Sequence, residues 1–151
     1  MVCVVRFPKN RMRFRSAGAE MRRQGADATV VAWSAAVALA EEAAEALASE
    51  GVEAEVINLR TLIPFDKASV LNSVRKTGRL VIVQEAVRRG GVGAEIAAAV
   101  VESEAFGYLQ APIVRVANPG VPVPHSAALH RFAFPHKDDV IAAVRHVVSY
   151  T

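Results

Sequence analysis

The sequence is poor in cysteine and in long apolar runs. Cys3 is the single cysteine among 151 residues, which excludes an internal disulfide and a multi-cysteine zinc site. Its apolar stretches are broken by Glu, Arg or Gly well before the roughly 20 residues that a membrane helix needs. The chain opens without the charged-then-apolar pattern of a secretory signal. We therefore expect a soluble intracellular protein that has no membrane partner.

Negative charge is scarce at the start of the chain. Residues 1–27 hold seven Lys and Arg against Glu20 and Asp27, a balance of +5, so the remainder carries −2 of the net +3. Because the excess belongs to one segment, we expect no nucleic-acid partner for the folded part. Residues 1–27 are interpreted as a basic leader or linker remnant in a cytoplasmic protein. The alternatives are a phosphate-gripping arm or a transit peptide, which would place the protein in the mitochondrial matrix.

One domain is expected over residues 28–151, because short β-branched runs alternate there with stretches of helical period. This alternation is typical of strands linked by crossover helices, which form a parallel sheet covered on both faces. We predict an α/β fold, a three-layer αβα sandwich whose mainly parallel sheet has about five strands. Strands are expected at 29–33, 55–59, 80–83 and 113–116, and helices at 35–50, 67–76, 95–106 and 140–148.

Local signals set the helix ends. Ser34 is expected to cap the first helix and Asp66 the second, whereas Gly51 and Gly78 follow their last turns. Four of the seven prolines lie in residues 118–135. We expect this segment to be an extended loop without a helix.

Glycines cluster after the third expected strand, at Gly90, Gly91 and Gly93. A glycine-rich turn before a helix can hold phosphate with its backbone N–H groups. However, Ile96 stands where a dinucleotide fingerprint has its third glycine, and the Lys-Ser/Thr pair of a phosphate loop is missing. A tight turn that permits close packing is the favoured interpretation. A stand-alone anion- or nucleotide-binding module remains an alternative.

Two charged residues follow strand ends, where ligands of parallel sheets bind. Glu85 is followed by Arg88 and Arg89, and the group is interpreted as a salt-linked turn in preference to a proton-transfer pair. Arg60 is interpreted as a loop brace in preference to an anion clamp. Arg60 and Glu85 together form a possible strand-end site.

The proline-rich segment carries histidines and apolar side chains. His125, His130 and His136 are spaced by five and six residues, which does not place them on one helical face. Surface or interface histidines are therefore expected in preference to a zinc site. Phe132 and Phe134 lie in the same segment, and exposed apolar residues there would need a covering partner.

Several motifs, in this order, resemble the C-terminal transketolase-like domain. They are Ala54-Glu-Val-Ile-Asn-Leu-Arg-Thr-Leu-Ile-Pro-Phe-Asp66, Val74-Arg-Lys-Thr-Gly-Arg-Leu80, Val83-Gln-Glu-Ala86, Gly90-Gly-Val-Gly-Ala-Glu-Ile96, Ala111-Pro-Ile-Val-Arg-Val116 and Val121-Pro-Val-Pro-His125. The resemblance is closest to the β subunit of the thiamine-diphosphate-dependent 2-oxo acid dehydrogenases, of pyruvate, branched-chain or acetoin type. It covers about residues 27–150. Ser34 stands where family members commonly have glycine.

The resemblance implies a role in assembly. In that family this domain packs β subunits together and helps to dock the acyltransferase core, while a preceding domain and the α subunit bind thiamine diphosphate and Mg²⁺. The resemblance thus implies a homo-oligomer that associates with the α subunit and the acyltransferase core. It implies no catalytic or cofactor-binding residue in this chain alone. The residues expected at an interface are Gly90, Gly91, Gly93, Glu95, His125, Phe132, Phe134 and Tyr150. The alternative is half of a split thiamine-diphosphate enzyme, completed by a separate cofactor-binding chain.

Overall fold

A five-stranded sheet organises the chain, of which the computed structural model describes residues 18–151. The strand order is β1-β3-β2-β4-β5; β2, β3, β4 and β5 run parallel, and β1 runs antiparallel to β3. The expected mainly parallel sheet is therefore confirmed. The strands are β1 (Glu20–Arg23), β2 (Ala28–Ala32), β3 (Ala54–Asn58), β4 (Leu80–Val87) and β5 (Val114–Asn118).

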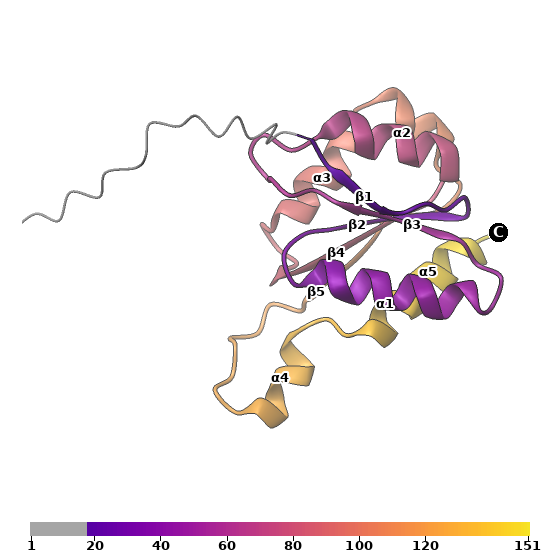
Figure 1. Cartoon of the computed structure of the whole chain (residues 1–151). Helices are drawn as coiled ribbons and strands as arrows, with labels where there is room; N and C mark the ends of the chain where they lie inside the picture. The colour runs from indigo at the N-terminus through magenta and orange to yellow at the C-terminus, as the bar shows by residue number, and fades with distance from the viewer. Residues whose placement is uncertain (1–17) are drawn as a thin grey trace, which may run out of the picture.

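Helices cover both faces of the sheet. Figure 1 shows α1 (Ala36–Ala48) and α5 (Lys137–Val148) on one face, with α2 (Lys67–Thr77) and α3 (Val92–Val101) on the other. A short 3₁₀ helix, η1 (Glu104–Tyr108), continues the second layer. The three-layer αβα sandwich is confirmed. Within residues 18–151, none of the helices is long and apolar enough to span a membrane.

One hydrophobic core lies on each face of the sheet, because side chains alternate between the two faces along each strand. Val30 lies in the core that α1 and α5 cover, whereas the next residue, Val31, lies in the core that α2 and α3 cover. All five residues of β2 are buried. The continuous apolar runs in the sequence thus reflect strands that are covered on both faces.

The predicted signals for α2 are confirmed, whereas the predicted cap of α1 is wrong. Asp66 accepts a hydrogen bond from the Ser69 N–H at 3.0 Å, and Gly78 ends α2 with φ +67°. The Ser34 side chain makes no cap hydrogen bond, although its carbonyl accepts from the Val37 N–H at 3.2 Å, and Ala35 takes the cap position of α1. Ser34 itself has φ +56°, a left-handed conformation that glycine adopts without steric cost.

The sheet begins earlier than the expected boundary at residue 28. Part of the predicted leader, residues 20–23, forms β1, which pairs with β3 through Met21 opposite Ile57. Arg22 and Arg23, two of the charges assigned to the leader, instead bind Glu41 and Glu53 in ion pairs. A short strand rich in charge lacks the apolar alternation that sequence patterns detect. The remainder of the predicted leader, residues 1–17, lies outside the described residues.

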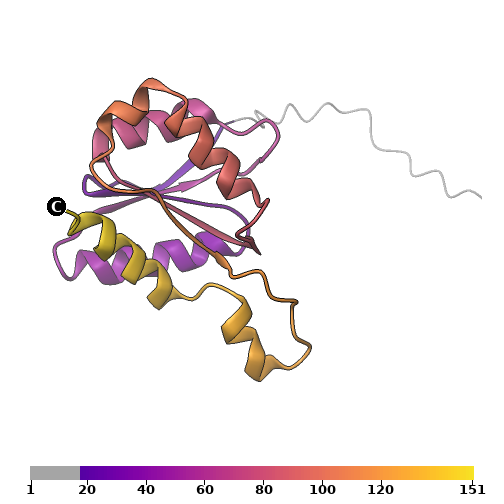
Figure 2. The same ribbon diagram turned by 180° about the vertical axis from the view of Figure 1, so that it is seen from behind.

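The segment between β5 and α5 contains a helix that was not expected. Four prolines border the helix α4 (Ala127–Ala133) without entering it, so the stretch after Pro124 is free to become helical. Figures 1 and 2 show α4 projecting away from the three layers. The expected helix at 95–106 is also corrected. It is divided into α3 and η1, and the Ser103 hydroxyl accepts from the Ala105 N–H at the start of η1.

Candidate functional site: a projecting arm

Residues 119–136, which we call the arm, leave the sheet at the end of β5. The buried side chain of Asn118 sets their direction, because its Oδ1 accepts hydrogen bonds from the N–H groups of Gly120 and Val121 at 2.7 and 3.1 Å. Asparagine commonly forms such turns through its own side chain. The arm returns to the domain at Pro135, which is buried.

The arm exposes large apolar side chains. Phe132 is 63% exposed, whereas Phe134 is partly covered. Exposed apolar residues that gather on one surface often mark a place where another molecule binds. The arm residues with this property are Val121, Val123, Leu129 and Phe132.

Histidines hold the arm in shape. A ring nitrogen of His130 lies 2.9 Å from the Pro124 carbonyl, and a ring nitrogen of His136 lies 2.9 Å from the Arg131 carbonyl. The His130 ring also meets Phe134 edge-on, at 5.6 Å between ring centres. His125, His130 and His136 are all exposed, as expected of surface or interface histidines. No group of three His, Cys, Asp or Glu side chains within residues 18–151 could hold a metal ion.

The glycine turn serves close packing, as predicted. The Gly93 N–H donates to Gln84 Oε1 at 2.8 Å, and a Cβ on Gly91 would lie only 2.4 Å from Gln84 Nε2. The buried Gln84 amide therefore fills the space that an anion would need beside these two glycines. Sequence reasoning missed Gln84. Its only signal was a polar residue directly after an apolar strand.

The structure does not bring the two strand-end residues together. Strand β2 lies between β3, which Arg60 follows, and β4, which contains Glu85, so two strand spacings of about 5 Å separate them. The predicted salt-linked turn is wrong, because Glu85 is exposed and forms no ion pair within residues 18–151. Arg60 braces its loop through its backbone N–H, which donates to Asn58 Oδ1 at 3.1 Å.

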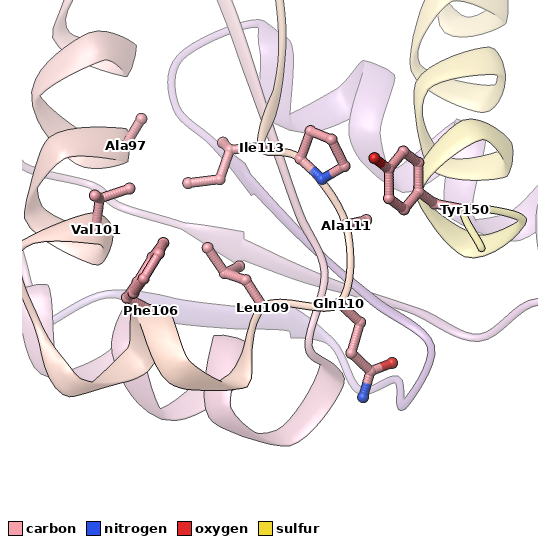
Figure 3. Close-up of a pocket in the computed structure, with 9 residues that line it drawn as sticks. Ala97, Val101, Phe106, Leu109, Gln110, Ala111, Ile113 and Tyr150 are labelled. Atoms are coloured by element: carbon pink, nitrogen blue, oxygen red, sulfur yellow. The ribbon is translucent and has the colours of Figure 1, made fainter.

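An apolar hollow of about 530 Å³ lies beside the C-terminus. Figure 3 shows Phe106 and Val101 on one side of it and Tyr150 on the other, with Ile113 between them. Tyr150 follows the end of α5 and lies beside the segment that enters β5. Gly91, in contrast, follows the far end of the neighbouring strand β4. The predicted interface residues thus occupy separate regions: the glycine turn, the arm and the C-terminus.

A buried polar cluster, not anticipated from the sequence, connects α2 to the sheet. Glu55 on β3 is 1% exposed, accepts from the Ser73 hydroxyl at 2.6 Å and forms an ion pair with Lys76. The Thr29 hydroxyl lies within hydrogen-bond distance of both Ser73 and Thr77. Since the buried members of the cluster satisfy one another, and only Lys76 reaches them from the surface, the cluster fixes α2 on the sheet.

These features define an α/β domain of four parallel strands with an antiparallel edge, whose most exposed aromatic side chains lie outside its two cores. The chain belongs to the family described as "Transketolase, C-terminal domain", whose model matches residues 17–140. The resemblance predicted from the sequence is therefore confirmed, and the matched range includes β1.

The most similar relatives include β subunits of 2-oxo acid dehydrogenases. The chain is 50% identical over 125 residues, 83% of its length, to the mitochondrial pyruvate dehydrogenase E1 component subunit beta-1 of Arabidopsis thaliana. It is 45% identical over 87% of its length to the mitochondrial 2-oxoisovalerate dehydrogenase subunit beta 2 of the same plant. The chain spans only 34% and 36% of these relatives.

A solved structure described as a split gene transketolase, an inactive beta4 tetramer, has the same fold. The TM-score is 0.80 at 30% identity, covering 92% of this chain and 45% of that one. The fold predicted from the sequence is thus that of a transketolase-type domain.

Proposed function

We propose that this chain is the assembly and docking domain of a 2-oxo acid dehydrogenase β subunit, without catalysis of its own. The observation that carries the proposal is the arm, whose helix α4 projects from the layers (Figure 2) and carries Phe132, which is 63% exposed. A second copy of the chain, the dehydrogenase α subunit and the acyltransferase core are the proposed partners. The glycine turn before α3, the arm and Tyr150 are the proposed contact surfaces. Relatives that are β subunits of such enzymes support this assignment.

Thiamine diphosphate and Mg²⁺ belong to the parent complex in this proposal. The described residues do not fit these groups, because Gln84 fills the glycine turn and residues 18–151 contain no metal-binding cluster. The proposal therefore assigns the chemistry of the cofactor to other parts of the complex. Purified chain supplied with thiamine diphosphate, Mg²⁺ and a 2-oxo acid should release no CO₂ above the rate of the buffer. Decarboxylation by the chain alone would contradict the proposal.

Self-association tests the arm directly. The double variant Phe132→Ser and Phe134→Ser should shift the mass in analytical ultracentrifugation from oligomer toward monomer, because it removes the aromatic surface. Circular dichroism should stay that of the folded chain. The matched control is Ile63→Ser with Tyr108→Ser, which changes two exposed apolar residues, 94% and 53% exposed, away from the arm. An unchanged mass for the arm variant, or an equal loss in the control, would count against the proposal.

A second candidate is half of a split thiamine-diphosphate enzyme. The similarity to a split gene transketolase in an inactive beta4 tetramer favours it. In that case a separately encoded chain would carry the cofactor domains. Mixing this chain with such a partner, thiamine diphosphate and Mg²⁺ should restore activity on a 2-oxo acid. If the mixture stays inactive while the chain still binds an acyltransferase core, the docking function is favoured.

The proposed location is the mitochondrial matrix. Relatives from rice, Arabidopsis, pea and yeast carry mitochondrial names, and the basic residues near the start of this chain are the segment proposed to direct transport. Import of the radiolabelled chain into isolated mitochondria, with protection from added protease, is the expected result. A chain that stays accessible to protease would contradict this location.

A further inference from the structure

The two edges of the sheet are protected to different degrees. At β1 the ladder shifts register between Met21 and Arg23, and Arg22 and Arg23 form ion pairs with carboxylates. Irregularity and charge are the usual means by which an edge strand avoids pairing with another chain. At β5, residues 114–117 are only half-buried and pair with β4 alone among the described strands. This ladder is regular from Val114 to Val116, and its own register shift lies in β4, between Val83 and Val87. Figure 2 shows β5 in front, between the layers of α3 and α5.

An apolar hollow opens at the start of this edge. It is the volume of about 530 Å³ described above, which Ile113 and Pro112 border just before β5. Phe106 and Tyr150, which line its two sides, are 59% and 46% exposed. A hollow of this size accommodates a large apolar side chain.

A cationic hollow of about 380 Å³ lies at the other end of the same edge, lined by Arg115 of β5 and by Arg131 and Phe132 of α4. The Arg131 guanidinium lies 4.9 Å from the ring centre of Phe132. Asp139, the carboxylate in the lining, accepts from the His136 N–H at 2.8 Å and so binds its own helix start.

The two arginines of this hollow are uncompensated. Neither Arg115 nor Arg131 forms an ion pair with any carboxylate in residues 18–151. Arg115 donates only to a carbonyl, that of Arg88, at 3.0 Å. Among the other arginines of residues 18–151, four form ion pairs with carboxylates, namely Arg22, Arg23, Arg75 and Arg145, whereas Arg60, Arg79, Arg88 and Arg89 do not. The cationic hollow is therefore suited to carboxylates supplied by another molecule.

We propose that the β5 edge binds an extended acidic segment of a partner protein as a sixth strand. Its large apolar side chain enters the hollow at Phe106, and its carboxylates bind Arg115 and Arg131. Residues 113–117 span about 13 Å, so about six residues of an extended chain reach both hollows. A peptide is favoured over a small anion, since an extended backbone both donates to and accepts from the outward groups of an edge strand, whereas an anion only accepts. This inference does not depend on the proposed function.

The test uses synthetic octapeptides that carry Phe at one end, two Glu at the other and Val-Thr repeats between them, made in both chain directions. Counterparts with Lys in place of Glu are the charge controls. In fluorescence anisotropy with the whole 151-residue chain at low salt, one acidic direction should bind at least about tenfold tighter than its Lys counterpart. Added salt should weaken this binding. Equal binding of acidic and Lys peptides in both directions would overturn the proposal.

Variants locate the binding. The double variant Arg115→Gln with Arg131→Gln should weaken the binding of the acidic peptide by at least about tenfold, since two charge-assisted hydrogen bonds are lost. The control, Arg22→Gln with Arg145→Gln, removes the same charge from other parts of the surface and should leave the affinity within about twofold. Arg131→Gln alone, a change on the exposed face of α4, should still weaken binding if the double variant misfolds. Equal effects of both double variants would place the peptide elsewhere.

Backbone methylation of the peptide tests strand addition itself. Alternate N–H groups of a strand point to its neighbour, so N-methylation of one alternate set should abolish binding and methylation of the other should be tolerated. Indifference to both sets would show a purely electrostatic contact and overturn the proposal. Two other results would also overturn the proposal. One is a dimer of this chain that the Arg115/Arg131 double variant dissociates but the peptide does not. The other is single-stranded DNA that binds equally well through the same arginines.

Discussion

Gln84 shows how differently two neighbouring glycines can be constrained. The three atoms nearest to a Cβ on Gly93 would all belong to side chains, namely Gln84 Oε1 at 2.7 Å, Ile82 Cγ2 at 3.1 Å and Gln84 Cδ at 3.2 Å. A Cβ on Gly91 would also lie 2.4 Å from the backbone oxygen of Val87. A side chain can be shortened by mutation, whereas a backbone carbonyl in β4 cannot.

Shortening Gln84 should therefore rescue one glycine variant and not the other. Gly93→Ala should lower the free energy of unfolding by about 1–3 kcal/mol. In a Gln84→Ala background the same change should cost less than about 1 kcal/mol, because the nearest clash is gone. Gly91→Ala should remain costly in both backgrounds. Urea denaturation of the variants measures these differences, and equal coupling of both glycines to Gln84 would contradict the assignment.

The tight turn could be predicted from glycine spacing, but its partner could not. The apolar run ends at Val83, whereas β4 continues to Val87. Along this extension alternation turns Gln84 inward and Glu85 toward solvent. The sequence drew attention to Glu85 because it is charged and followed by arginines. Burial, which a sequence does not display, is what gives the amide its role.

At the scale of elements, the cap of α2 also ties this helix to the first strand. Burial raises the pKa of the Asp66 carboxyl, but hydrogen bonds from Ser69, Ala19 and Ala68 lower it by more, so its pKa lies below the usual 3.8. The bond from the Ala19 N–H, at 3.0 Å, comes from the residue that precedes β1. The Asp66 carboxylate thus connects the start of α2 to the start of β1, through a bond between residues that are 47 positions apart in sequence.

Asp66 should therefore stabilise the fold in a pH-dependent manner. Because its pKa is lower in the folded than in the unfolded state, the stabilisation is present above about pH 4 and is lost as the pH falls through the folded pKa. Asp66→Asn should cost about 1 kcal/mol at pH 7, because a neutral amide oxygen accepts weaker hydrogen bonds than a carboxylate, and its difference from the wild type should shrink below pH 4. Ser69→Ala, which removes the hydroxyl donor and leaves the carboxylate, should have a smaller effect. Denaturant curves at pH 7 and pH 3 provide the check; a constant difference would refute the mechanism.

Elements with strong local signals were predictable, and elements defined by tertiary contacts were not. Asp66 and Gly78 specify the ends of α2 by their own side-chain and backbone chemistry. α4 is only seven residues long and lies among prolines. The prolines of this segment therefore predicted an extended loop, although residues 127–133 themselves favour a helix. Ser34 has the chemistry of a cap, but its φ of +56° places it in a turn instead. The arm aromatics were predicted as a surface, whereas the direction in which the arm projects depends on Asn118.

For the whole molecule, the main difference from sequence expectation is where the fold begins. β1 covers the outer edge of β3, and Arg22 and Arg23 connect it to Glu41 on α1 and to Glu53 just before β3. Without β1, the backbone groups of β3 on that side would be unpaired. A strand edge with unpaired backbone groups can pair with another chain and so promotes aggregation. The proposed domain therefore starts before β1 and not at residue 28.

Two shortened chains distinguish these boundaries. A chain that starts at Gly18 should unfold cooperatively at the denaturant concentration found for the full chain, because it retains β1 and the Ala19 bond to Asp66. A chain that starts at Ala28 should lose about 3 kcal/mol, roughly the worth of three or four hydrogen bonds. It should also aggregate on concentration, as measured by light scattering. The control is the full-length chain with Arg22→Gln, which keeps the strand and loses only exposed ion pairs, so its stability should fall by less than about 1 kcal/mol. Equal stability of the two shortened chains would place the domain boundary at residue 28. In that case β1 would pair with the edge of the sheet without contributing to the stability of the folded domain.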